Sequence, residues 1–204
     1  KESIESILNQ SFQNYEFIIV NDINSPEVNN YLIHVDNNNA NVRLILNKLN
    51  IGLTKSLIKA IDISNGKYIA RQDSDDLSSI NRLEIQHNYL KSNKDVVLLG
   101  TAYAIDYGGS NQKNILPPLD HKEIVSSFLR QNPFVHSSVI FDKGAYFKTG
   151  GYNKDCKYGQ DFDLWPKFIK YGTLKNISDN LVTRRLSNDS VSLKYSVHFY
   201  QTLN

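Results

Sequence analysis

Three carboxylates directly follow a β-prone run in the first half of the chain. The segment reads Lys67-Tyr-Ile-Ala-Arg-Gln-Asp-Ser-Asp-Asp76, which brings Asp73, Asp75 and Asp76 together at the end of a predicted strand. Like charges at this spacing repel and raise one another's pKa unless a cation or a donor-rich ligand neutralises them. Carboxylate oxygens suit Mg²⁺ or Mn²⁺, and a metal held there could in turn hold a diphosphate.

The first half alternates between helical and strand-like patterns. We expect helices at 1–9, 26–37 and 53–64, and strands at 15–21, 42–46 and 67–72. Near-continuous apolar strands that alternate with helices predict a mostly parallel sheet covered on both faces. Ligands bind beyond the carboxyl ends of the strands in such a sheet. Asp22 and Asp73 each follow a predicted strand, so we expect them to share one site.

The second half is less regular. We expect helices at 81–91, 120–130 and 162–171, and strands at 95–104, 135–141, 174–177 and 181–185. No repeat, low-complexity segment or linker separates this half from the first. A chain of 204 residues is therefore expected to form a single domain, 1–204.

Composition excludes several functional classes. The net charge of +2 is small and dispersed, so nucleic acid is not an expected partner. Cys156 is the only cysteine, which rules out an internal disulfide and fits a reducing compartment. No apolar run approaches the ~20 residues of a membrane span, and no signal-peptide pattern is visible.

The start of the chain is unusual. The sequence contains no methionine and opens inside a helical pattern, with Ile4, Ile7 and Leu8 on one face. No N-cap or strand precedes that pattern. We therefore expect the natural N-terminus to lie outside this sequence.

A set of motifs occurs in a fixed order along nearly the whole chain. The motifs are Glu2 to Asp22, Asn50-Ile-Gly-Leu53, Gly66 to Asp76, Asn81-Arg-Leu-Glu84, Asn132 to Val139, Gly150-Gly-Tyr152 and Asp161-Phe-Asp-Leu-Trp165. As an ordered set they resemble family 2 glycosyltransferases. The resemblance implies the GT-A fold, a Rossmann-like α/β domain with a mostly parallel central sheet, here without its first strand. Residues 1–76 would then bind the nucleotide-sugar and residues 77–204 the acceptor.

The resemblance also implies a reaction. A sugar would move from a nucleoside diphosphate sugar, with UDP as the default, to a glycan or lipid-linked acceptor, with inversion. The expected setting is bacterial surface polysaccharide assembly on the cytoplasmic side, with peripheral membrane association as an option.

The donor-binding residues follow from the matching positions. Asp22 would accept a hydrogen bond from the ring N–H of the base, although a capping or turn role is the alternative. Asp73 and Asp75 would lie on the same side of an extended backbone. Asp75 is the expected direct ligand of Mn²⁺ or Mg²⁺, with Asp73 near the ribose and the metal. Arg71 would contact a phosphate or fix a carboxylate.

The remaining site residues lie in the second half. By resemblance Asp161 is the catalytic base, and Gln160 stands where the family has a glutamate. His136 would border the diphosphate, or would be a hydrogen-bonded structural residue. Arg184, ahead of 188–192, would close over the diphosphate or lie on the surface. Trp165 fits core packing and sugar stacking equally.

Three alternatives stay open. A catalytically impaired nucleotide-binding domain is compatible with Gln160 and a missing first strand. A sugar nucleotidyltransferase has a related fold, and the region that would carry its glycine-rich loop is absent from this sequence. A haloacid dehalogenase-type phosphotransferase also uses acidic strand ends, but it carries them on its first strand.

Overall fold

The computed structural model describes residues 1–23, 25–108, 111–156 and 158–185. Its helices are α1 Glu2–Leu8, α2 Pro26–Asn38, α3 Leu53–Ile63, α4 Arg82–Ser92, α5 His121–Ser127, α6 Lys143–Lys148 and α7 Gln160–Leu164, with 3-10 helices η1 His136–Ser138 and η2 Trp165–Lys170. Its strands are β1 Phe17–Asn21, β2 Val42–Leu46, β3 Tyr68–Ala70, β4 Leu77–Ser78, β5 Val96–Asp106, β6 Gln112–Ile115, β7 Ile140–Asp142 and β8 Thr173–Arg185.

The elements expected in the first half are confirmed, and local chemistry explains their boundaries. Ser25 caps α2 because its hydroxyl accepts a hydrogen bond from the backbone N–H of Val28, and Pro26 supplies a helical φ at the first position. Gly52, with φ +86°, turns the chain into α3. Strand β2 precedes α3 and strand β3 follows it, and each of these two strands ends where polar residues begin.

The sheet is mixed, so the expectation of a mostly parallel sheet is wrong. β1 and β2 form a parallel pair by themselves, and a second sheet has the order β3-β7-β5-β8-β4, with β6 added to β5. In that second sheet only β5 and β8 are parallel among the described strands. Of the antiparallel pairs among the described strands, β5–β6 joins strands close in sequence, whereas β3–β7, β5–β7 and β4–β8 join strands that are far apart in the chain. β3 and β7 also join the two halves of the chain in one sheet.

Two predictions in the second half need correction. Residues 135–141 were expected to form one strand, but η1 precedes the short strand β7. Residues 174–177 and 181–185 belong to one long strand, β8, whose pairing with β5 contains register shifts. The intervening residues are polar and exposed, which hides the continuity of the strand from a hydrophobicity pattern.

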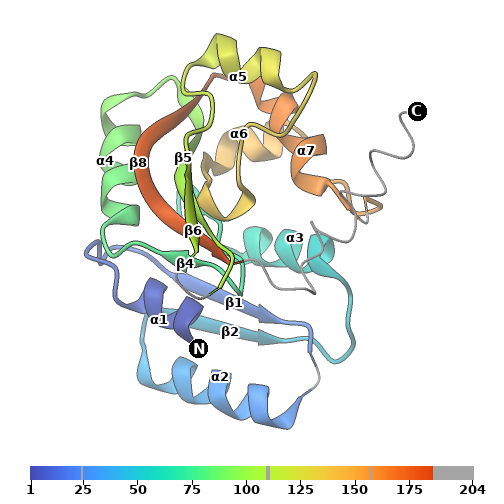
Figure 1. Cartoon of the computed structure of the whole chain (residues 1–204). Coiled ribbons are helices and arrows are strands. Elements are labelled where there is room, and N and C mark those ends of the chain that lie inside the picture. The colour runs from blue at the N-terminus through green and yellow to red at the C-terminus, as the bar shows by residue number, and fades with distance from the viewer. Residues whose placement is uncertain (24, 109–110, 157, 186–204) are drawn as a thin grey trace.

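The main core lies between the larger sheet and helices α6, α7 and η2, on the side where Figure 1 also shows α5. Trp165 is fully buried there and packs against Phe141, Phe134 and Phe168. Its burial favours the core-packing interpretation over sugar stacking. Among the described helices, none combines the length and apolar character that crossing a membrane requires.

A cavity of about 500 Å³ separates β1 from β3. Apolar residues of both strands and of α3 line it, including Ile18, Leu57 and Ile69. Glu16 before β1 accepts a hydrogen bond from the backbone N–H of Gly66 before β3 (3.1 Å), and Asn21 and Asp73 at the opposite ends line one cavity, so the two strands run in the same direction. Within the described chain, β3 pairs only with β7 and β1 only with β2, so each strand has a free edge toward this cavity.

We expect an added apolar strand to fill this cavity. Lys1 lies beside the carboxyl ends of both strands, in a second cavity shared with Asn21 and Asp73. A run of about five apolar residues placed ahead of Lys1 would span roughly 17 Å and pair with both free edges. Its burial should raise Tm by roughly 5–10 °C in calorimetry. A Gly-Ser extension of equal length is the control, and an equal Tm for both would contradict the prediction.

Candidate functional site

The acidic segment forms a tight turn, which we call the acid turn, Asp73–Asp76. The backbone N–H of Asp76 donates to the carbonyl of Asp73 (3.3 Å), so the chain reverses through Ser74 and Asp75. The expectation that Asp73 and Asp75 share one side of an extended backbone is therefore wrong. Instead, the carboxylates of Asp73 and Asp76 converge, and Asp75 is exposed.

Ser137 joins the two converging carboxylates, those of Asp73 and Asp76. Its hydroxyl lies 2.6 Å from Oδ2 of Asp73 and also contacts Oδ2 of Asp76, and it accepts from the backbone N–H of Asp73 (3.2 Å). Burial raises the pKa of Asp76, and the charge of Asp73 raises it further. A hydroxyl has one proton to donate, so it can satisfy only one carboxylate at a time. The acid turn thus concentrates negative charge at a fixed point.

Arg71 supplies the opposing charge. Its guanidinium is 5% exposed and forms an ion pair with Asp73. Burial alone would raise the pKa of Asp73, but Arg71 and the Ser137 hydrogen bond outweigh it and lower that pKa to about 2. Nε of Arg71 has no hydrogen-bond partner among the described residues. The structure therefore places Arg71 against a carboxylate, one of its two expected roles.

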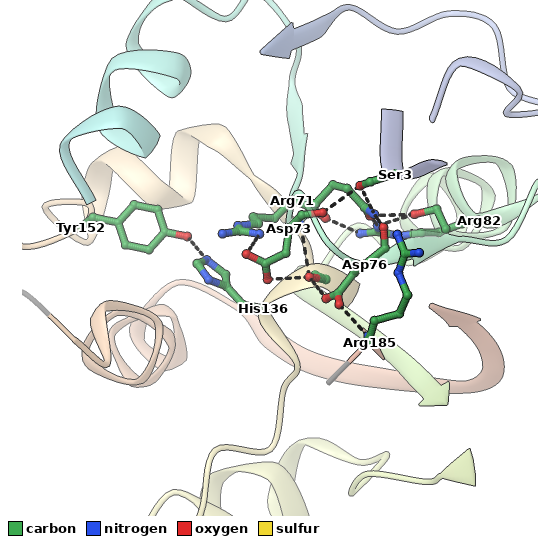
Figure 2. Close-up of polar contacts among 11 residues, drawn as sticks. Ser3, Arg71, Asp73, Asp76, Arg82, His136, Tyr152 and Arg185 are labelled. Carbon is green, nitrogen blue, oxygen red and sulfur yellow. Dashed lines mark hydrogen bonds and ion pairs between the residues drawn. The ribbon is translucent and has the colours of Figure 1, made fainter. Parts of the chain in front are cut away.

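His136 and Tyr152 meet beside this ion pair (Figure 2). Nε2 of His136 lies 2.8 Å from the hydroxyl of Tyr152, and the ring of His136 contacts the ring of Trp165. Burial holds the pKa of His136 well below its usual range and that of Tyr152 well above. Both side chains are therefore neutral near pH 7, so they contribute hydrogen bonds to the site without adding charge.

Asp161 lies in the first turn of α7, after Gly159 with φ +68°. Nδ2 of Asn132 donates to its Oδ2 at 2.7 Å, which fixes the orientation of the carboxylate. Burial raises the pKa of Asp161, and the nearby charge of Arg71 partly offsets that effect. Arg71 thus forms an ion pair with Asp73 and acts on Asp161 only through its charge.

Asp22 lies beyond the end of β1, as expected, but it is already engaged. Its carboxylate accepts hydrogen bonds from Nδ2 of Asn47 (2.8 Å) and from the backbone N–H groups of Ile51 (3.2 Å) and Gly52 (2.8 Å). Burial would raise its pKa, and these donors lower it. Asp22 thus anchors the loop before α3, which exposes Leu49. Ser56 also donates to this carboxylate, so the donors around Asp22 match the roughly four hydrogen bonds that a carboxylate can accept.

The carboxyl ends of β1 and β3 meet at a cavity of about 400 Å³. Asn21 and Ile23 line one side, and Asp73 and Ser74 line the other. Asp22 is not among the lining residues, so a site shared by Asp22 and Asp73 stays a prediction. This cavity is distinct from the larger apolar cavity that separates the strands themselves.

The two arginines at the end of β8 point to different neighbours. The charge of Arg184 acts on Tyr103 of β5. Arg185 instead reaches the acid turn, where its backbone N–H donates to Oδ1 of Asp76 (3.1 Å) and its Nε to the carbonyl of Asp75 (2.6 Å). The role of Arg184 at the diphosphate stays a prediction, and residues 188–192 lie outside the described residues. Successive side chains of a strand point to opposite faces, so the sequence alone could have predicted that Arg184 and Arg185 have different neighbours.

The donor atoms of the acid turn suit a divalent cation only in part. No cluster of three or more His, Cys, Asp or Glu side chains is placed to hold a metal in the part of the chain that the structure describes. Mg²⁺ in nucleotide sites, however, often uses one or two carboxylates and takes its other ligands from phosphates and water. Asp75 is exposed and the side chain of Asp73 is 34% exposed, so each can offer oxygen atoms.

Asp161→Asn is expected to stabilise the protein at pH 7. A raised pKa means that the ionised carboxylate costs stability, and this cost disappears as the pH falls through that pKa toward the ordinary value of 3.8. The variant should gain about 1 kcal/mol in urea unfolding at pH 7, and the gain should vanish at pH 3.5. Asp163→Asn is the control, because that side chain pairs with Lys167 and is 37% exposed. A gain for Asp161→Asn that does not change with pH would contradict this account.

Comparison with known proteins agrees with this geometry. Residues 1–148 match the model of glycosyl transferase family 2. An uncharacterized glycosyltransferase of Haemophilus influenzae is 30% identical, with 96% of this chain and 64% of the relative covered. The O-antigen biosynthesis glycosyltransferase WbnJ of Escherichia coli is 31% identical, with 98% and 78% covered.

A solved structure shares the fold. Residues 1–349 of S. aureus TarS, in complex with UDP, superpose with a TM-score of 0.69 at 16% identity, covering 91% of this chain and 56% of TarS. The chain spans less than two thirds of the length of TarS and of the Haemophilus relative. The family match covers well over half of the chain, and from it we conclude that this chain belongs to glycosyl transferase family 2.

Proposed function

We propose that this chain is the catalytic domain of an inverting glycosyltransferase that uses a UDP-sugar and a divalent metal. Membership of the family supports the reaction class. The observation that carries the proposal is the acid turn, where the carboxylates of Asp73 and Asp76 converge on Ser137 beside the cation Arg71, at the cavity between the ends of β1 and β3. Asp161, oriented by Asn132, is a separate carboxylate suited to the acceptor.

The donor would bind across the carboxyl ends of β1 and β3. Asp22 would accept the ring N–H of uracil in exchange for one of its present donors, and its neighbours Asn21 and Ile23 line the cavity that extends to Asp73. UDP is the proposed nucleotide because the TarS structure that shares this fold contains UDP. Arg185, at the acid turn, is the arginine best placed to act near a diphosphate.

Asp75 and Asp73 would hold Mn²⁺ or Mg²⁺ together with the diphosphate. Both side chains offer oxygen atoms, and the ion would take its remaining ligands from phosphate and water. A metal bound there acts as a Lewis acid that neutralises the departing diphosphate.

Asp161 would act as the general base. It removes the proton from an acceptor hydroxyl as that oxygen attacks the anomeric carbon from the face opposite the diphosphate, which inverts the configuration. Asn132 fixes the carboxylate, and burial raises its pKa and so increases its basicity. Hydrogen bonds from the backbone and from Asn132, and the charge of Arg71, favour the ionised form and partly offset the effect of burial.

The acceptor would be a glycan or a lipid-linked sugar of a surface polysaccharide. The name of the Escherichia coli relative, which refers to O-antigen biosynthesis, supports this assignment. The reaction would take place on the cytoplasmic side, with peripheral membrane association. The alternative is a domain that binds nucleotide without transfer, which Gln160 favours because the usual acid beside Asp161 is missing.

Calorimetric titration of UDP with and without Mn²⁺ tests the proposal. Wild type should bind UDP at least tenfold more tightly with Mn²⁺, a difference of about 1.4 kcal/mol. Asp75→Asn should lose that gain, because an amide lacks the charge that holds the ion. Asp179→Asn, an exposed acid on β8, is the matched control and should keep the gain.

Turnover separates the two candidate functions. Hydrolysis or transfer of a UDP-sugar by wild type, lost in Asp161→Asn while UDP binding persists, supports the transferase. Metal-dependent binding without turnover of any UDP-sugar supports the impaired domain. No binding of UDP, GDP or TDP by wild type would overturn the proposed donor site.

A further inference from the structure

Arg82, in the first turn of α4, carries a buried charge without a carboxylate in contact. It is 0% exposed, and burial lowers its pKa to about 9, so it remains protonated at neutral pH. Its hydrogen-bond acceptors are all neutral: the side chains of Gln72, Gln86 and Ser78 and the carbonyls of Arg71 and Val139. Burying a cation in this way is costly, so a purely structural benefit is a poor explanation for it.

The acceptors of Arg82 lie on every segment that builds the acid turn. Nη2 donates to the carbonyl of Arg71, just before the turn (2.8 Å), and Nη1 donates to Oγ of Ser78, just after it (2.9 Å). Nη2 also reaches the carbonyl of Val139 (3.3 Å), which follows η1 and therefore the segment that carries Ser137. One guanidinium thus connects both ends of the turn to the segment whose hydroxyl joins its carboxylates (Figure 2).

Gln72 extends this connection to the turn itself. Its Oε1 accepts from Nη1 of Arg82 (2.9 Å) and from Oγ of Ser78 (2.8 Å). Its Nε2 donates to the carbonyl of Asp76 (2.7 Å) and to Oγ of Ser3 in α1 (3.3 Å). The backbone of Asp76 is therefore fixed to Arg82 through a single amide group.

We propose that Arg82, acting through Gln72, is a positioning residue that sets the geometry of the acid turn for the metal and diphosphate of the donor. This inference rests on the proposed function, since it assumes that the turn holds the donor. A guanidinium suits the role because its five N–H donors have a fixed planar geometry, whereas lysine offers three on a flexible stem.

The test compares Arg82→Lys, Gln72→Met and Leu90→Ala. Arg82→Lys keeps the charge but cannot reach all the acceptors. Gln72→Met keeps the volume and removes the link to Asp76. Leu90→Ala is matched for destabilisation, because Leu90 is 1% exposed on the same helix and packs among Leu99 and Ile140, away from the turn. Affinity for UDP is measured calorimetrically with and without Mn²⁺, at a temperature where each variant is folded by circular dichroism.

Arg82→Lys and Gln72→Met should each lose at least tenfold in the Mn²⁺-dependent gain in UDP affinity. Leu90→Ala should lower Tm and keep that gain, because instability alone does not change the affinity of the folded molecule. If Arg82→Lys does not fold, the Mn²⁺-dependent gain in UDP affinity of Gln72→Met tests the positioning role alone. If both variants keep the Mn²⁺-dependent gain in UDP affinity that the wild type shows, the positioning role is overturned. Absence of the gain in wild type would overturn the proposed donor site instead.

Discussion

The hydrogen bonds of Ser137 to Asp73 and Asp76 hold together parts of the chain that are far apart in sequence. They fix the end of β3 to η1, and Arg185 brings the end of β8 to the same point. Negative charge is thereby concentrated where strands from both halves of the chain end. The convergence of the carboxylates depends on this contact, while Gln72 and Ser3 hold the backbone of the turn through the carbonyls of Asp76 and Asp73.

The site is built from buried charges that do not stabilise the fold by themselves. Arg71 opposes Asp73 and lies near Asp161, while Arg82 satisfies its donors with neutral groups only. A binding site that fixes charges before its ligand arrives carries their desolvation cost in the free protein. The aromatic core around Trp165 packs against the site, since the ring of His136 contacts the ring of Trp165.

Sequence patterns predicted the first half of the fold and the meeting of strand ends, because apolar periodicity reflects local burial. Asp22 and Asp73 do follow neighbouring strand ends. The mixed pairing of the larger sheet was missed because register depends on distant contacts. The turn at Asp73–Asp76 is missed when the alternating carboxylates are taken as a strand pattern, although Asp and Ser are common turn residues. Ser137 and Arg82 gain their roles only through tertiary contacts, so their residue types alone do not predict those roles.

The central claim is that the acid turn holds a divalent metal together with the donor diphosphate. Crystals of the protein grown with UDP and Mn²⁺, measured at the manganese absorption edge, test it directly. The account predicts an anomalous peak bonded to Asp75 or Asp73 and to phosphate oxygens, with uracil at Asp22. UDP bound elsewhere, or bound at the turn with no manganese peak, would contradict it.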